Sequence, residues 1–285
     1  MAANNTKLIS LLLFQPQLVV SPSTLPFLKG IQDLLNTSYT ATYCAHPEIF
    51  GTSHLRVADP AQIADIIGDD GFTVVVLLVN EEDGYAEIVA TGSVKNFGDG
   101  DVESYAQWSK NLSGTHWAEK AKENDKSEKD LNHKTSLHEK KDEEIKYEVT
   151  AFAVSTEHQS MGLGARVLKE IEWLASADTH GVLRIDRVRE NTAHTSEFRL
   201  RNSSEDGCIQ GINIDQLKSD ISSISTTLPT AKKSRLVLMG IRELGNEAYY
   251  QRRGWKSVWS GTVPVGMWDC KQECTMVYME KDLAY

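Results

Sequence analysis

The sequence has little that would mark a disulfide-rich, membrane-spanning or nucleic-acid-binding protein. Only four of its 285 residues are cysteine, too few for a chain of this length to depend on a disulfide scaffold. No apolar stretch approaches the roughly 20 residues that a membrane-spanning helix needs. The formal charge of -10 argues against the basic surface that nucleic acid requires. We therefore expect reduced thiols, no membrane partner and no nucleic-acid partner.

Metal-binding and targeting patterns are equally sparse. Cys270 and Cys274 are close in sequence, but a C-x3-C pair without a second pair or a nearby histidine is a weak zinc pattern. The apolar run Leu8–Phe14 is short, and no clean small-residue cleavage pattern follows it. We expect a first strand there rather than a secretory signal. These observations predict no metal site and a cytoplasmic protein, with the nucleus as the alternative compartment.

The rest of the composition is that of an ordinary globular protein, with 40% apolar and 25% charged residues. The length suits one large domain or two small ones, and we expect a single domain over 1–285. Two polar stretches, at about 98–146 and 187–233, interrupt an otherwise regular alternation of strand and helix patterns. Because such stretches cannot bury a core, we expect both to be insertions.

Outside these insertions, hydrophobic periodicity predicts an alternating α/β chain. Helices are expected from Pro26, after Asp59-Pro60, directly after Gly162, and over Asn246–Arg253. Apolar, β-branched runs predict strands. These are Leu8–Phe14, Phe72–Val79, Ala86–Val94, Glu148–Ser155, Arg235–Ile241, Trp255–Trp259 and Thr275–Glu280.

The most informative segment runs from Gln159 to Ala165, between a predicted strand and a predicted helix. The first backbone N–H groups of a helix lack intrahelical partners, and the helix dipole favours an anion there. Glycines let such an anion approach the backbone closely. The segment is not a Walker loop, because no Gly-Lys-Ser/Thr follows, and Val167 breaks the dinucleotide fingerprint. Alone, it is either a phosphate site or a glycine turn.

Three motifs in the right order resemble those of the GNAT acyltransferases. The pattern Gln159-x-x-Gly162-x-Gly164 resembles the Gln/Arg-x-x-Gly-x-Gly/Ala motif of that family. The stretch from Tyr250 to Trp255 is similar to its late Tyr-x-x-x-Gly-aromatic motif, and Thr275–Leu283 resembles its closing strand. The resemblance implies a GNAT-like α/β fold: a mixed, mostly antiparallel twisted sheet, flanked by helices, with a splayed fourth and fifth strand pair.

The resemblance also implies that acetyl-CoA is the acyl donor. The pantetheine arm would pair with backbone groups of Phe152, Ala153 and Val154, and Asn246 is a further candidate contact. Met161 stands where many relatives have Arg or Lys. Arg166 is a candidate substitute for that missing charge, and a solvated arginine on the helix is the alternative interpretation. The pyrophosphate would lie on the backbone amides of Gln159, Ser160, Met161, Gly162, Leu163, Gly164 and Ala165.

Acyl transfer to an amine needs a base for the ammonium, donors for the thioester oxygen and an acid for the leaving thiolate. The resemblance implies Tyr250 as the thiolate acid and the Val154 amide as the donor. It implies Glu148 as the base, whose pKa burial would raise towards neutrality. A charged residue at the start of a strand is the alternative interpretation of Glu148. Glu243 and water chains are further candidates for the base, and Glu157, nearer the loop, is less suited.

Acceptor contacts in the family come from the first helix pair and the last hairpin, which points to Tyr39, Tyr43 and His46. The prediction is an N-acetyltransferase that moves acetyl from acetyl-CoA to a primary amine of a small molecule or peptide. The amine would attack directly in a ternary complex. The alternative is a non-catalytic acyl-CoA-binding module that recruits a protein partner through its insertions. The last hairpin is a candidate homodimer surface.

Overall fold

The computed structural model describes residues 6–14, 18, 20–21, 24–51, 55–68, 71–80, 82, 85–97, 144–176, 197–200, 211–213 and 233–283. Most of the two expected insertions lies outside these residues, so the single-domain interpretation stays a prediction. The fourth strand begins at Glu144, slightly before the expected end of the first insertion. Across the described residues, no helix combines the length and the apolar character that crossing a membrane would require.

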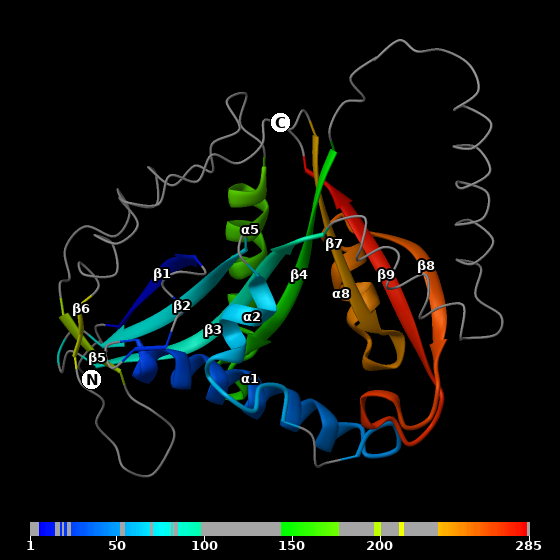
Figure 1. The fold of residues 1–285 in the computed structure, drawn as a ribbon, viewed down its shortest axis with the longest axis horizontal. Helices are drawn as coiled ribbons and strands as arrows, with labels where there is room; N and C mark the ends of the chain where they lie inside the picture. Colours follow the sequence, from blue (N-terminus) through cyan, green and yellow to red (C-terminus); the bar gives the residue numbers. More distant parts are fainter. Residues whose placement is uncertain are drawn as a thin grey trace.

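One mixed sheet organises the chain, with the strand order β1-β2-β3-β4-β7-β9-β8 (Figure 1). All neighbours in this order pair antiparallel except β4 and β7, which run parallel. This arrangement confirms the predicted mixed, mostly antiparallel sheet. Its strands are β1 (Thr6–Phe14), β2 (Phe72–Asn80), β3 (Tyr85–Asn96), β4 (Glu144–Val154), β7 (Lys233–Ile241), β8 (Lys256–Val263) and β9 (Cys274–Asp282).

The second expected insertion also contributes to the sheet, which the sequence patterns did not indicate. It contains β5 (Glu197–Leu200) and β6 (Gly211–Asn213), which pair antiparallel with each other. β5 also pairs in parallel with the start of β3, at Tyr85 and Ala86. Since β4 pairs with β3 only from Ala90 onward, β5 takes the part of the β3 edge that β4 leaves uncovered.

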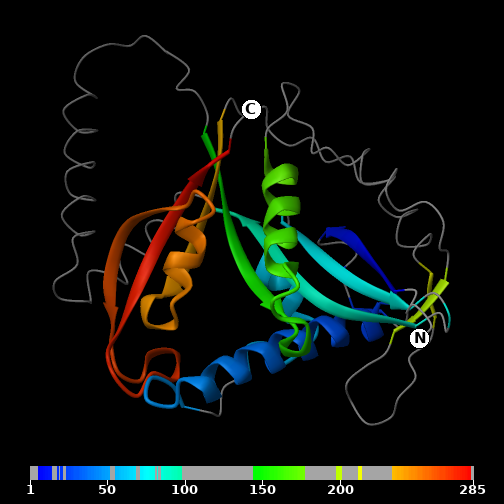
Figure 2. The same ribbon diagram turned by 180° about the vertical axis from the view of Figure 1, so that it is seen from behind.

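Helices cover both faces of the sheet (Figures 1 and 2). α1 (Leu25–Ala45) and α2 (Gln62–Ile67) lie on one face, and α5 (Leu163–Ala175) and α8 (Asn246–Gln251) lie on the other. α1 carries its proline in the first turn, where the missing N–H costs nothing. α2 ends at Gly68, whose φ of 65° suits glycine.

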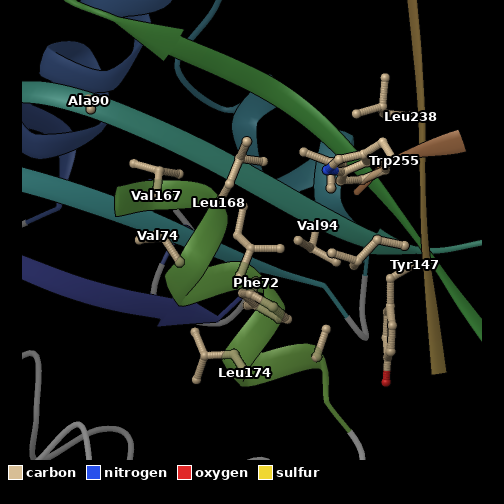
Figure 3. Packing of buried hydrophobic residues seen from close by; sticks show 14 of the residues in the cluster. Phe72, Val74, Ala90, Val94, Tyr147, Val167, Leu168, Leu174, Leu238 and Trp255 are labelled. Carbon is tan, nitrogen blue, oxygen red and sulfur yellow. The ribbon is translucent and has the colours of Figure 1, made fainter. Parts of the chain in front are cut away.

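The two helical layers bury separate apolar clusters against the sheet. α5 packs its apolar stripe on β2 and β3, and Figure 3 shows Val167, Leu168 and Leu174 facing Phe72 and Val74. On the opposite face, α1 and α2 pack against the other side of β1, β2 and β3. A third cluster lies on β7, β8 and β9 and includes residues just after the end of α1. Each helix buries one face because its apolar residues recur at helical spacing.

A bulge in β4 marks the point at which the sheet opens. The register between β3 and β4 shifts between Thr91 and Ser93, and Ala151 in β4 has a φ of 44°. β4 and β7 pair only as far as Glu148 and Val237, although both strands continue beyond these residues. Figures 1 and 2 show the two strands close together at one end and apart at the other. The predicted splayed strand pair is therefore present.

α1 crosses the end at which β4 and β7 are apart (Figures 1 and 2). Near the middle of the helix, the Ser38 hydroxyl donates to the Val154 carbonyl over 2.9 Å. The segment after the helix pairs with the loop between β8 and β9 through a Phe50–Cys270 bridge. In the same contact, the Gly51 N–H donates to the Asp269 carbonyl over 2.8 Å. These bonds fix α1 across the open end of the divergent strands.

Candidate active site

The predicted donor loop is an open helix N-terminus. α5 begins at Leu163, and its N-cap residue Gly162 has a left-handed φ of 78°. No side chain caps the helix, and a Cβ built on Gly162 would meet nothing within 4 Å. Ser160 also has a positive φ, of 67°. The loop therefore turns sharply and leaves the first amides of a 13-residue helix available to an anion.

Arg166, the candidate cation for this loop, forms hydrogen bonds with β1. The Arg166 Nε donates to the Ser10 hydroxyl over 3.0 Å, and its Nη2 lies 3.5 Å from the Leu8 carbonyl. Both partners belong to β1, and a contribution of Arg166 in place of the missing charge at position 161 stays a prediction. Met161, within the loop, is 55% exposed. No side chain caps the start of α5, so an anion bound at this loop would meet backbone amides.

The end of β4 carries the backbone expected to meet the pantetheine arm. Phe152, Ala153 and Val154 lie beyond the last residue that pairs with β7. Ala153 is buried on the α1 face, whereas Phe152 and Val154 pack with the α5 cluster on the other face. These three residues are brought next to the donor loop, because Phe152 and Val154 both lie close to the Cβ position of Gly164, at 3.4 and 3.5 Å.

Tyr249 is a site residue that the sequence analysis missed. Its hydroxyl oxygen lies 3.0 Å from the Cβ position of Gly164, so Tyr249 links α8 to the first turn of α5. The Arg253 guanidinium carbon lies 3.6 Å from the centre of the Tyr249 ring, and its Nη1 donates to the Tyr249 carbonyl over 2.9 Å. Burial raises the pKa of Tyr249, and the Arg253 charge opposes that shift. The sequence signal that could have indicated Tyr249 is Arg253, four residues later on the same side of a helix.

Tyr250 has the properties required of a proton donor. Its ring meets Tyr249 and Trp255 edge to face, with centroids 5.2 and 5.8 Å apart. Burial is the main cause that raises the pKa of Tyr250 well above its ordinary value, and the nearby phenols of Tyr39 and Tyr249 add to the shift. The phenol is therefore protonated at neutral pH. No group in the described part of the chain hydrogen-bonds to its hydroxyl, which leaves the proton available to a ligand.

Glu148 lies at the closed end of the divergent strands, at the last pairing with β7. It is buried, with 7% exposure, and its Oε2 lies 3.0 Å from the Lys95 Nζ on the neighbouring strand β3. The ammonium favours the charged carboxylate and so opposes the effect of burial that the sequence analysis invoked. The structure shows Glu148 in an ion pair with Lys95. Its function as a base stays a prediction.

We expect Glu148→Gln to lower the free energy of unfolding by about 1–3 kcal/mol, because the Lys95 ammonium would lose its charged partner in a largely buried setting. Denaturant unfolding of this variant, Lys95→Met and the double variant measures the coupling between the two side chains. If the two single effects add exactly in the double variant, the ion pair makes no contribution to stability.

The candidate acceptor residues lie along the last turns of α1. The rings of Tyr39 and Tyr43 meet edge to face at 6.3 Å, and Tyr43 contacts Phe50 at 4.8 Å. His46 ends α1, and its Nδ1 lies 3.4 Å from the Glu48 Oε1. The two tyrosines therefore share one side of the helix, whereas the imidazole is engaged with Glu48. Asn246 is exposed at the start of α8, and its contact with the donor stays a prediction.

The described cysteines differ sharply in environment. Cys44 is exposed, whereas Cys270 and Cys274 are buried, with their sulfur atoms 3.5 Å apart. Among the described residues, no group of three or more histidine, cysteine or acidic side chains is arranged to hold a metal ion. Cys208 lies outside these residues.

We expect iodoacetamide at about pH 8 to modify Cys44 in the native protein and to leave Cys270 and Cys274 intact. Burial raises the pKa of both buried thiols, that of Cys274 to about 12, so almost no reactive thiolate is present. Peptide mapping by mass spectrometry after a short exposure reads each site separately. Modification of Cys270 as fast as Cys44 would contradict this assignment.

Comparison with known proteins returns a fold likeness. No family model matches the chain, and no curated protein matches it in sequence. Among solved structures, it is similar to a putative phosphinothricin N-acetyltransferase, with 8% identity, a TM-score of 0.42, and coverage of 98% of this chain and 100% of the other. It is also similar to a GNAT-family acetyltransferase from Streptococcus pneumoniae, with 9% identity, a TM-score of 0.41, and coverage of 98% and 100%.

A third similar structure is NAA60 from Arabidopsis thaliana in complex with acetyl-CoA, with 10% identity, a TM-score of 0.41, and coverage of 97% of this chain and 99% of that one. These structures carry descriptions from the same family that the sequence motifs resemble. At such low identity and TM-score they add no argument about activity.

Proposed function

We propose that this protein transfers an acetyl group from acetyl-CoA to a primary amine by direct attack in a ternary complex. The observation that carries the proposal is the convergence of three features at one place in the fold. The uncapped N-terminus of α5, the end of β4 beyond its pairing with β7, and Tyr249 of α8 meet around Gly164, and the ring of Tyr250 lies against that of Tyr249.

Each feature suits one part of the donor. The amides from Gln159 to Ala165 would hold the pyrophosphate, since several N–H groups and the helix dipole share its charge. The unpaired edge of β4 would hydrogen-bond to the amide groups of the pantetheine arm, as a strand does at a sheet edge. The acetyl group would then lie near Tyr250, beside the end of the divergent strands.

In the proposed reaction, the amine nitrogen attacks the thioester carbonyl carbon and forms a carbon–nitrogen bond. The tetrahedral intermediate then breaks its carbon–sulfur bond, and the electron pair leaves with sulfur. Tyr250 gives its phenolic proton to that sulfur, a task that suits a phenol kept neutral by burial. One proton of the incoming ammonium goes to a base, for which Glu148 or a water chain is the candidate. A second nitrogen proton, lost as the amide forms, restores the Tyr250 phenol.

Calorimetry with acetyl-CoA and a thiol-release assay over a panel of primary amines test this proposal together. Binding of acetyl-CoA, followed by amine-dependent release of free thiol, supports it. Binding without thiol release for any amine overturns the catalytic assignment and favours the non-catalytic acyl-CoA-binding module. Binding of ATP or NAD in place of acetyl-CoA would overturn the assignment of the loop itself.

A further inference from the structure

A serine interrupts the buried stripe of α1, the helix that crosses the open end of β4 and β7 (Figures 1 and 2). Leu34 and Leu35 are both buried against the sheet. Ser38 follows them by four and three positions, and residues at this spacing share one side of a helix. Its hydroxyl donates to the Val154 carbonyl over 2.9 Å. A polar side chain on a stripe that faces the core is typical of a position with a purpose other than packing.

The peptide unit between Val154 and Ser155 is held on both sides by segments that are distant in sequence. The Ser155 N–H donates to the Val89 carbonyl on β3 over 2.9 Å. On the other side, the Val154 carbonyl accepts the bond from Ser38. β7 no longer pairs with β4 at this level, because the last pairing is at Glu148. Ser38 therefore takes the place of a neighbouring strand for this carbonyl.

The register of β3 and β4 fixes the direction of the Val154 amide. In an antiparallel pair, the N–H and C=O of one residue point to the same neighbour, and those of the next residue point the opposite way. Since Ser155 bonds to β3, the backbone groups of Val154 point away from β3 and into the gap between β4 and β7. The bond from Ser38, which lies on α1, agrees with this direction. The Val154 N–H thus faces the gap in which the proposed donor lies.

The end of β4 beyond its bulge is a short piece of strand. Only residues 152–154 follow Ala151, whose φ of 44° marks the bulge. Ala153 and Val154 pair with β3 on one side, whereas β7 has already diverged on the other. A strand end with one neighbour opens more easily than the middle of a sheet, because fewer bonds hold it. The bond from Ser38 adds an attachment to α1 at this end.

An amide that stabilises the thioester oxygen must be aimed at that oxygen. The oxygen gains negative charge in the transition state, and removal of one such donor typically lowers turnover by about 10²- to 10³-fold. A misaligned donor loses part of this effect, because hydrogen bonds weaken as they bend. A tilt of the strand end would swing the Val154 N–H out of the gap. The group that holds the end of β4 therefore also sets the strength of this donor.

We infer that Ser38 is a positioning residue for acetyl transfer, whose hydroxyl holds the end of β4 so that the Val154 N–H stays aimed at the thioester oxygen. This inference rests on the proposed function, because the amide that Ser38 positions serves that reaction. Ser38 acts through Val154, to whose carbonyl its hydroxyl proton is donated. Its effect falls on the transition state, because the amides proposed for the pyrophosphate lie at the start of α5.

Ser38→Ala removes only the hydroxyl, and alanine is the better helix former, so the substitution does not weaken α1 itself. We expect kcat for amine acetylation to fall by about tenfold, less than for complete loss of a donor, because the Val154 amide keeps part of its alignment. The dissociation constant for acetyl-CoA should change by less than about twofold, because the helix N-terminus stays in place. Steady-state kinetics and calorimetry measure the two quantities.

The stretching frequency of the bound thioester carbonyl reports the hydrogen bond directly. A donor that polarises a carbonyl lowers this frequency. Infrared difference spectra of acetyl-CoA with an isotopically labelled thioester carbonyl should therefore show a higher frequency in Ser38→Ala than in the wild type. A loss of packing elsewhere in the protein would not move this band. The measurement needs no acceptor amine, so it does not depend on turnover.

Two further variants serve as controls. Ser38→Thr keeps the hydroxyl and should restore both the carbonyl frequency and kcat to near the wild-type values. Thr42→Val is the matched control on the same helix. The Thr42 hydroxyl lies one turn later and donates to the Ser38 carbonyl over 3.0 Å, a bond within α1. Its removal should leave the frequency and kcat unchanged.

The outcomes separate this inference from the proposed function. A wild-type frequency and kcat in Ser38→Ala overturn the inference, as does a Ser38→Thr variant that performs no better than Ser38→Ala. Loss of acetyl-CoA binding in Ser38→Ala also overturns it, because the serine would then support the site as a whole. If the wild type binds acetyl-CoA but releases thiol with no amine, the catalytic assignment falls, and the infrared comparison still decides the role of Ser38. Failure of the wild type to bind acetyl-CoA overturns both.

Discussion

Replacing Tyr250 with phenylalanine should lower kcat for amine acetylation by roughly 10²- to 10⁴-fold, the usual contribution of a positioned proton donor. The variant loses one oxygen atom and keeps the ring that packs against Tyr249 and Trp255. The thiolate must then leave without a proton from this group. Because the hydroxyl has no hydrogen-bond partner in the described residues, its removal leaves no buried donor or acceptor unsatisfied there.

Steady-state kinetics, with calorimetry of acetyl-CoA binding, separates this effect from a loss of affinity. We expect the dissociation constant for acetyl-CoA to stay close to that of the wild type while kcat falls, the pattern of an interaction made in the transition state. Tyr249→Phe is the matched control, since it removes the neighbouring hydroxyl from the same helix. Wild-type turnover by Tyr250→Phe would reject the assignment, as would an equal loss of kcat in both variants.

Local sequence signals predicted the elements that position the site. The β-branched run at Phe72–Val79 became β2 because such residues favour a buried strand. Gly68 ends α2, and Gly254, with a φ of 85°, lies shortly after α8. Both fit the preference for glycine with a positive φ after the last turn of a helix. The apolar stripe after Gly162 became α5 in the same way. In each case the information lies within one element.

Contacts between segments that are distant in sequence could not be predicted from local patterns. The environment of Glu148 is set by Lys95, which lies more than fifty positions earlier and faces it only through the register of β3 and β4. Arg166 lies one turn into α5, but its guanidinium reaches β1, at the other end of the described chain. The position of Asp269 depends on the space left by Gly51, and neither residue belongs to a motif.

The structural importance of Gly92, which lies beside the β4 bulge, depends on its neighbours in the folded sheet. Gly92 on β3 lies opposite the β4 bulge, and a Cβ there would come within 2.6 Å of Val167 and 2.9 Å of Phe152. Glycine at this position therefore lets α5 pack closely over the bulge. The sequence shows Gly92 as an isolated glycine in a strand, and its contact with α5 follows only from the tertiary structure.

Gly164→Val should raise the dissociation constant for acetyl-CoA by about tenfold or more, equivalent to at least about 1.4 kcal/mol. A Cβ at this position points towards the Tyr249 hydroxyl at 3.0 Å, and towards Phe152 and Val154 at 3.4 and 3.5 Å. The two methyl groups of valine extend further in that direction. They would occupy the space between the first turn of α5 and the end of β4, where the proposed donor lies.

Gly164→Ala is the graded control, because its single methyl group adds only the Cβ, which lies 3.0 Å from the Tyr249 hydroxyl and requires a small shift there. We expect the alanine variant to bind acetyl-CoA far better than the valine variant. Overpacking in Gly164→Val should also cost about 1–3 kcal/mol of stability, so denaturant unfolding must accompany the calorimetry. A folded Gly164→Val protein that binds acetyl-CoA as tightly as the wild type would show that the donor does not pass between α5 and the end of β4.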